Sequence, residues 1–365
     1  MPTAGKTVRK KTGAKKASGP AKSFVGELQV KGFIRLDQFW PNVQLGASQG
    51  SDADTVVAGV DLNSFRFRPN PSAAWQKTRV FEGATVRKKK VLRGGSAQSP
   101  GDPADPPRLS VRLQWVDSPE LHYPFIKKDV PSGGVEYRQP FGETATVALL
   151  AMLKQRGGNA LTLQVTLKTR VDSPNDVFDA NGRLIGDVIV HFPDGTSEDI
   201  NLWLAKNGWA FPTYYNTITA AEKAKFDAAF DEARRKRRGF WKYDVTNTAS
   251  PVPFNSNRRF RSGTGTAPGE PKDPTYLPKL FRRSAGMFVE KQAGKVPQAM
   301  TLPDYVARAK DRYTPAADFM AGKTKTKSLA TAFQGNRFTP APEDVIFVEK
   351  TATLKDANGA KVVKW

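Results

Sequence analysis

Three charged residues lie close together where one predicted strand ends. Residues 111–120 read VRLQWVDSPE. Apolar and polar residues alternate in the first half of this segment, which predicts a half-buried strand, and Ser118-Pro119 predicts a turn. Arg112, Asp117 and Glu120 are then gathered around the strand end. An arginine can bind a phosphate through two hydrogen bonds, and carboxylates can bind a hard cation or activate water. An ordinary surface strand with one Arg–Asp ion pair explains these ten residues equally well.

A second pair of acids comes earlier in the chain. Asp52 and Asp54 are separated by one small residue and precede an apolar segment. In an extended chain both side chains point to the same side, which suits cation binding. A turn is the competing interpretation, because Asp is common in turns. Asp61 and Asn63 offer a second position for the same pattern, with Asn63 as the poorer ligand.

Composition narrows the chemistry and the partner. The chain has 365 residues, no cysteine, only two histidines (His122 and His191) and a net charge of +22. Thiolate chemistry and disulfides are therefore excluded, and a multi-histidine metal site is disfavoured. The excess positive charge attracts polyanions, so nucleic acid is the predicted partner, ahead of an acidic membrane surface. A basic protein that is merely soluble is the third interpretation.

The sequence contains no membrane-targeting signal. No run of 18 apolar residues is present, so we expect no membrane partner. The basic N-terminus lacks the apolar core of a signal peptide, and we therefore expect a cytoplasmic protein.

The elements that must position the charged residues can be predicted from periodicity. Strands are expected in the segments 24–40, 65–67, 85–92, 111–116, 161–167 and 184–192. Helices are expected over 142–156, 202–208 and 219–239, the last with Thr219 and Glu222 as a capping box. Helices do not alternate regularly with the strands, which argues against a parallel α/β sheet. The order predicts an α+β fold: a closed, five-stranded OB-fold-like β-barrel with packed helices.

Composition also divides the chain into regions. Residues 1–23 are basic and are predicted to form a disordered arm. Residues 24–244 form the predicted barrel domain, with an inserted loop at about 58–107. The basic run in this insert is a candidate nucleic-acid contact or simply a solvated hairpin. Residues 245–365 are a Pro/Gly-rich C-terminal extension, to which the sequence assigns no fold and which could drape over the barrel or bind protein partners.

Over about residues 24–244 the chain resembles the staphylococcal (micrococcal, thermonuclease-type) nuclease family. The segment 51–55 is similar to the family's Asp-Gly-Asp-Thr motif, with Ala53 in place of glycine. The segment 111–120 is similar to its Val-Arg-Leu strand and Asp-Thr/Ala-Pro-Glu turn. Further matches follow in the family's order, at 139–145, 179–184, 194–195, 201, 208–210 and 238–241.

The resemblance implies a role for each matched residue. Asp54 and Asp117 would ligate Ca²⁺, with the carbonyl of Ser118 as a further ligand. Glu120 would hold or deprotonate the attacking water, and Arg112 and Arg183 would bind the scissile phosphate. Asp52 is assigned to the surroundings of the metal, with a turn as its alternative role. Tyr214 or Tyr215 would contact the nucleotide, with a core tyrosine as the alternative.

The resemblance therefore implies a calcium-dependent endonuclease that cleaves DNA with little sequence specificity. RNA is a second candidate substrate. Two alternatives stay open. One is a non-catalytic nucleic-acid-binding or scaffold protein on the same barrel. The other is a nuclease subunit of a larger defence or phage-encoded assembly.

Overall fold

A closed barrel of five strands forms the centre of the structure. The structure is a computed structural model, and it describes residues 26–43, 51–94, 106–125, 135–170, 173–259, 273–348 and 352–365. The order around the barrel is β1 (Glu27–Arg35), β2 (Thr55–Val60), β8 (Arg108–Leu113), β13 (Leu184–His191) and β12 (Thr162–Arg170). β12 pairs with β1 from Glu27↔Arg170 to Arg35↔Thr162 and so closes the barrel. The β8–β13 pair is parallel and the other four are antiparallel. The predicted α+β barrel is confirmed, whereas the predicted arm at 1–23 lies outside the described residues.

The alternating pattern of β8 explains how the barrel exposes its charged residues. Leu109, Val111 and Leu113 are buried, whereas the intervening Ser110 and Arg112 are only partly buried. Successive side chains of a strand point to opposite faces, so filling the interior with these apolar residues places Arg112 on the outer face.

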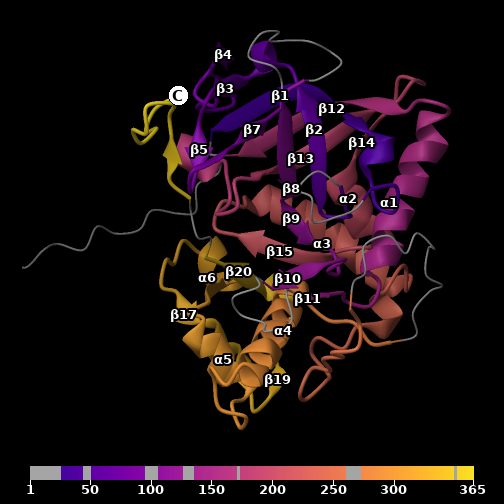
Figure 1. The fold of residues 1–365 in the computed structure, drawn as a ribbon, viewed down its shortest axis with the longest axis vertical. Coiled ribbons are helices and arrows are strands. Elements are labelled where there is room, and N and C mark those ends of the chain that lie inside the picture. The colour runs from indigo at the N-terminus through magenta and orange to yellow at the C-terminus, as the bar shows by residue number, and fades with distance from the viewer. Residues whose placement is uncertain are drawn as a thin grey trace, which may run out of the picture.

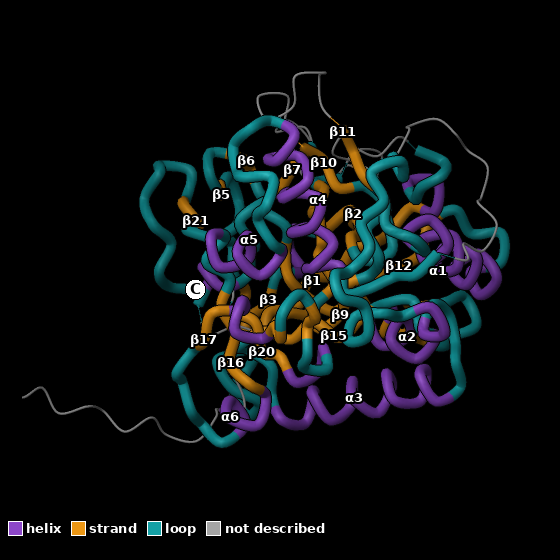
Figure 2. Tube along the Cα trace, turned by 90° about the horizontal axis from the view of Figure 1, so that it is seen from below, coloured by secondary structure: helices purple, strands orange, loops and turns teal. Residues whose placement is uncertain are grey.

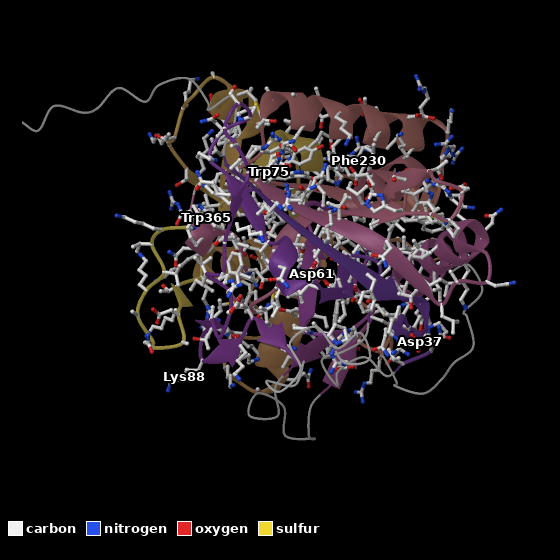
Figure 3. The ribbon with its side chains drawn as sticks, turned by 90° about the horizontal axis from the view of Figure 1, so that it is seen from above. Asp37, Asp61, Trp75, Lys88, Phe230 and Trp365 are labelled. Atoms are coloured by element: carbon white, nitrogen blue, oxygen red, sulfur yellow. The ribbon has the colours of Figure 1, made fainter. Side chains whose placement is uncertain are left out.

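Three helices of the barrel domain match the prediction closely. They are α1 (Gly142–Gly157), α2 (Ile200–Asn207) and α3 (Ala220–Arg235). The Thr219 hydroxyl accepts a hydrogen bond from the Glu222 amide at 3.2 Å, which satisfies one of the free donors at the start of α3. α3 runs along one side of the strands (Figure 2), and Phe230 packs on its inner face (Figure 3).

A second sheet joins the barrel domain to the C-terminal region, residues 245–365. Its order is β17 (Lys327–Ser328), β16 (Arg312–Pro315), β20 (Val345–Phe347), β15 (Phe211–Tyr215) and β9 (Trp115–Asp117). The first three strands come from the C-terminal region, and β20 pairs in parallel with β15. In Figure 1 most of the described part of this region lies below the barrel, in orange and yellow, whereas the yellow end of the chain lies beside the barrel. The C-terminal region is therefore built onto β15, which pairs on its other side with the strand that ends at Asp117.

The C-terminal region contains helices where composition had indicated mainly extended chain. They are α4 (Pro278–Gln292), α5 (Leu302–Arg308) and α6 (Ala316–Met320). α5 begins with a full capping box formed by Thr301 and Asp304. β20 pairs with β15 and β16. A hairpin of β18 (Phe333–Gln334) and β19 (Arg337–Phe338) completes the region.

Between β2 and β8, the described residues of the insert expected at 58–107 form short strands on the side of the barrel. They are β3 (Arg66–Arg68), β4 (Gln76–Lys77), β5 (Thr85–Val86), β6 (Lys89–Lys90) and β7 (Leu92–Arg93). The end of the chain covers them: β21 (Leu354–Lys355) pairs with β5, and Trp365 stacks on Phe67 with ring centroids 4.0 Å apart. Lys88 projects outward from the β5–β6 turn (Figure 3).

Three short strands complete the described fold: β10 (Tyr123–Phe125), β11 (Val135–Tyr137) and β14 (Ser197–Asp199). Among the described residues, no helix combines the length and the apolar character needed to cross a membrane.

Candidate active site

A sharp break between β8 and β9 positions the acids of the site. Trp115 has a φ of 68°, a left-handed conformation that interrupts the strand expected to run through 116. The Gln114 amide donates to the Gly186 carbonyl at 3.0 Å, and the buried Asn201 donates to the Gln114 carbonyl at 3.0 Å. The chain therefore leaves the barrel at Gln114 and pairs with β15, with Asp117 opposite Phe211.

Three carboxyl groups at this end of the barrel are near enough to affect one another's charge: Asp54, Asp117 and Glu120, which we call the carboxylate cluster. Asp54 immediately precedes β2, and its carbonyl accepts from the Leu113 amide at 2.9 Å. The antiparallel β2–β8 register, with Thr55 opposite Arg112, thus brings Asp54 to the end of β8. The Asp54 and Asp117 carboxyl groups are close enough to share a hydrogen bond.

The acids of the cluster differ in their electrostatics. Burial, followed by repulsion from Asp52, Asp117 and Glu120, raises the pKa of Asp54 well above its ordinary value. Burial also acts to raise the pKa of Asp117, but Arg282 and Arg112 outweigh it and hold that pKa below the ordinary value. Burial raises the pKa of Glu120 despite the nearby Arg282. An acid with a raised pKa beside an ionised one is an arrangement typical of functional sites.

Two of the sequence-predicted arginines flank the cluster. Arg112 lies 3.6 Å from Asp117, measured from Nη2 to Oδ1. Arg183 donates from Nη1 to the Thr55 hydroxyl at 3.0 Å, and that hydroxyl donates to Asp54 at 3.3 Å. Arg183 is held in turn by Asp179, whose carboxylate accepts from its Nε at 2.8 Å. Both arginines therefore face the same end of the barrel as the acids.

A third arginine in the site comes from the C-terminal region and was not anticipated. Arg282 of α4 binds Asp117 through two hydrogen bonds, Nη1–Oδ1 at 3.1 Å and Nη2–Oδ2 at 2.7 Å. Its Nη1 also donates to Glu120. Asp117 is fully buried, and the Arg282 side chain is 19% exposed. The apolar spacing of Leu280, Phe281 and Ala285 could have indicated the helix, but nothing local indicated which carboxylates it would reach.

The loop that carries Glu120 is hydrogen-bonded to Gln139, and Gln139 is hydrogen-bonded to the segment that precedes α4. The Glu120 amide donates to the Gln139 side chain at 3.2 Å, and the Glu120 carbonyl accepts from the Gln139 amide at 2.7 Å. The Gln139 side chain also donates to the Thr275 hydroxyl at 3.1 Å and to the Tyr276 carbonyl. Gln139 thereby connects the Glu120 loop to the segment that leads into α4.

Three more residues considered from the sequence are Asp52, Ser118 and Asp61. Asp52 accepts from the Thr55 amide at 2.8 Å, which is the turn interaction that was its alternative role. The Ser118 hydroxyl donates to the Trp209 carbonyl at 2.9 Å. Asp61 lies at the opposite end of β2 from Asp54, which removes it from the site.

The two tyrosines face different ways, because adjacent residues of a strand point to opposite sides. Tyr214 is fully buried, and its hydroxyl donates to Asp227 of α3 at 2.8 Å. Tyr214 therefore has the surroundings of a core tyrosine, which was the alternative role for this residue. Tyr215 is partly buried, with its ring centroid 5.9 Å from the Arg112 guanidinium.

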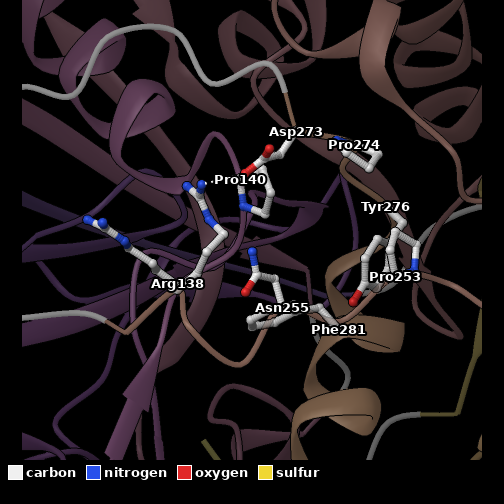
Figure 4. Close-up of a pocket in the computed structure, with 9 residues that line it drawn as sticks. Arg138, Pro140, Pro253, Asn255, Asp273, Pro274, Tyr276 and Phe281 are labelled. Carbon is white, nitrogen blue, oxygen red and sulfur yellow. Dashed lines mark hydrogen bonds and ion pairs between the residues drawn. The ribbon is translucent and has the colours of Figure 1, made fainter.

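A pocket of about 150 Å³ lies between the 138–140 loop, the 253–258 segment and the first turn of α4. Arg138, Tyr276 and Phe281 contribute to its lining (Figure 4). Phe281 lines this pocket, whereas Asp117, Glu120 and Arg282 do not.

Comparison with known protein families gives one match. Residues 110–243 match the family model described as staphylococcal nuclease homologue. The chain contains a staphylococcal nuclease-like domain. No curated protein matches the chain. The matched segment of the nuclease-like domain contains Arg112, Asp117, Glu120 and Arg183, whereas Asp54 and Arg282 lie outside it.

The donor chemistry of the cluster fits a hard cation. Asp54 and Asp117 are buried carboxyl groups whose mutual repulsion a dication would relieve, and oxygen is the ligand that Ca²⁺ prefers. Within the described residues, no three His, Cys, Asp or Glu side chains converge as a ligand set. Backbone, hydroxyl or water oxygens would have to supply the remaining ligands.

Proposed function

We propose that this chain is a calcium-dependent endonuclease that hydrolyses phosphodiester bonds in DNA and, as a second substrate, RNA. The observation that carries the proposal is the meeting of Asp54, Asp117 and Glu120 with Arg112 and Arg183 at one end of the barrel. Asp54 and Asp117 supply oxygen ligands for a cation, and Glu120 supplies a base for water. The two arginines bind the phosphate. The net charge of +22 supports a polyanionic substrate.

Each side chain has a distinct part in this mechanism. Asp54, Asp117 and the Ser118 carbonyl would hold Ca²⁺, which supplies a Lewis acid that neutralises phosphate charge when bound. Glu120 accepts the proton of the attacking water; burial raises its pKa, which makes it a stronger base than an exposed glutamate.

Arg112 and Arg183 stabilise the extra negative charge that develops on the pentacovalent phosphorus. Arg183 is already fixed by Asp179 and Thr55, so it needs little reorganisation when the phosphate arrives. Tyr215, beside Arg112, would contact the nucleotide next to the scissile bond.

Cleavage of supercoiled plasmid and of single-stranded DNA and RNA tests this function. The wild type should cleave with Ca²⁺ and lose activity with a chelator. Glu120→Gln should reduce cleavage by about 10²- to 10⁴-fold, the usual contribution of a general base. Glu82→Gln, in the insert, is the matched control and should cleave normally. Undiminished cleavage by Glu120→Gln would exclude this mechanism.

The ion pairs of Arg282 with Asp117 and Glu120 favour one second function, a non-catalytic nucleic-acid-binding protein. A guanidinium that satisfies both acids permanently would leave a basic barrel that binds without cleaving. Salt-sensitive DNA binding with no turnover in Ca²⁺, Mg²⁺ or Mn²⁺ would support this second function.

A further inference from the structure

Arg282 forms hydrogen bonds to the carboxylates of Asp117 and Glu120. The proposed function needs these two carboxylates for metal binding and for activation of water. Its two terminal nitrogens bind both oxygens of Asp117, and one of them also contacts Glu120. Nη1 therefore lies between two carboxylates, one proposed to ligate the metal and one proposed to activate water. A forked guanidinium pair of this kind is among the stronger hydrogen-bonded ion pairs in proteins.

The helix that carries Arg282 is fixed by contacts outside the carboxylate cluster. The neighbouring Arg283 binds Asp311 of the C-terminal region, with Nη2–Oδ1 at 2.9 Å. The segment before α4 is attached to the Glu120 loop through Gln139 and Thr275. The position of Arg282 is therefore set by the docking of the whole C-terminal region.

A dication and this guanidinium cannot use the same lone pairs at the same time. Asp117 is fully buried, so its charge needs a partner in either state. In one state the partner is Arg282, and in the other it is the metal. Exchange between them needs movement of Arg282, whose side chain is 19% exposed and so has an open side toward solvent.

We propose that Arg282 is a tethered cation that competes with Ca²⁺ for Asp117 and Glu120, so that the C-terminal region lowers the metal affinity of the nuclease-like domain. The inference rests on the proposed function, because it takes these two acids as part of a calcium site. Docking of α4 then restrains the enzyme, and release of α4 activates it.

Calcium binding to the full-length protein tests the competition directly. Isothermal titration calorimetry of CaCl₂ into wild type, Arg282→Gln and Arg337→Gln gives the three Kd values without any substrate. We expect Arg282→Gln to bind Ca²⁺ at least tenfold more tightly than wild type. Arg337→Gln, which removes the same charge from the exposed β18–β19 hairpin, should bind as wild type does.

Thermal melting provides a readout that survives partial destabilisation. In chelator, Arg282→Gln should melt below wild type because Asp117 loses its two-bond ion pair and keeps only Arg112 at 3.6 Å, and Ca²⁺ should raise its Tm more than it raises that of wild type. Arg282→Lys keeps one charge but cannot form the fork, so its calcium affinity should lie between those of wild type and Arg282→Gln.

Three results would overturn the proposal, and they separate it from the proposed function. Equal or weaker Ca²⁺ binding by Arg282→Gln, with cleavage intact, would exclude the competition but not the proposed function. A hundredfold loss of cleavage by Arg282→Gln at saturating Ca²⁺ would assign Arg282 to the phosphate instead. No Ca²⁺ binding and no cleavage by either protein would exclude the proposed function itself.

Discussion

Arg234 of α3 and Glu343 of the C-terminal region form a two-bond ion pair, with Nη1–Oε1 at 2.6 Å and Nη2–Oε2 at 2.7 Å. The two residues are 109 positions apart. The side chains are 27% and 21% exposed, so the pair is only partly screened by water. It fastens the C-terminal region to the nuclease-like domain at a point remote in sequence from α4.

This ion pair should contribute measurably to stability. We expect Glu343→Gln to lower the free energy of unfolding by about 1 kcal/mol, since forked and partly buried pairs exceed typical surface pairs. Urea unfolding followed by circular dichroism measures the change. Glu232→Gln, which breaks the more exposed pair with Lys236, is the control and should have no measurable effect. An equal loss in both variants would contradict a special role for the Arg234–Glu343 pair.

The Thr55 hydroxyl should matter more for cleavage than for folding. It connects Arg183 to Asp54, with bonds of 3.0 and 3.3 Å. Thr55→Val keeps the shape but removes the connection, so we expect about a tenfold or greater loss of kcat from misplaced groups. Thr55→Ser should retain most of the rate. Steady-state cleavage assays with both variants, at matched Tm, check this expectation; full activity of Thr55→Val would refute it.

Two glycines should be essential for the contact between α2 and the end of α3. Gly239 has a φ of +54°, and a Cβ built there would lie 2.0 Å from the Gly208 carbonyl oxygen. Gly239→Ala should therefore cost about 3 kcal/mol, from backbone strain and overpacking together.

Gly195 is the matched control for Gly239. It has a φ of +81°, but a Cβ there would meet nothing within 4 Å. Gly195→Ala should cost about 1 kcal/mol, from backbone conformation alone. Chemical denaturation of the two variants separates the cost of steric crowding from the cost of backbone conformation. Similar losses in the free energy of unfolding would contradict steric crowding at Gly239.

Lys279 should make stability rise with pH in the alkaline range. Burial lowers its pKa from 10.5 to about 8, although Asp311 partly opposes this. Below pH 8 the folded protein carries a buried charge at a cost. Between pH 8 and 10.5 the unfolded chain holds a proton that the folded chain has released, so folding becomes more favourable as pH rises.

Lys279→Met should remove this dependence. We expect the variant to be more stable than wild type at pH 7, by at most about 3 kcal/mol, and the difference to vanish near pH 10.5. Arg283 remains to neutralise Asp311 in the variant. Thermal melts of both proteins from pH 7 to 10.5 measure the difference in stability. A difference that stays constant across that range would contradict the lowered pKa of Lys279.

Much of the nuclease-like domain could be predicted because its signals are local. Strand alternation and helix caps depend on neighbouring residues, so the helices at 142, 200 and 220 begin close to their expected positions. Arg112, Asp117 and Glu120 are separated by a few residues, and a strand followed by a turn can only bring them together. The left-handed break at Trp115 was missed, because Asn201 and the Gly186 carbonyl fix it from distant parts of the chain.

The sequence by itself determined the barrel and the order of the motifs that deliver two arginines and three acids to one end of it. Only the tertiary structure decided that Asp54 rather than Asp61 reaches Asp117, because the choice depends on the β2–β8 register. It also decided that Tyr215 rather than Tyr214 faces Arg112, and that Arg282 closes on the acids from 165 residues away. Contacts at such separations arise from the packing of whole elements, and no local pattern of residue types encodes that packing.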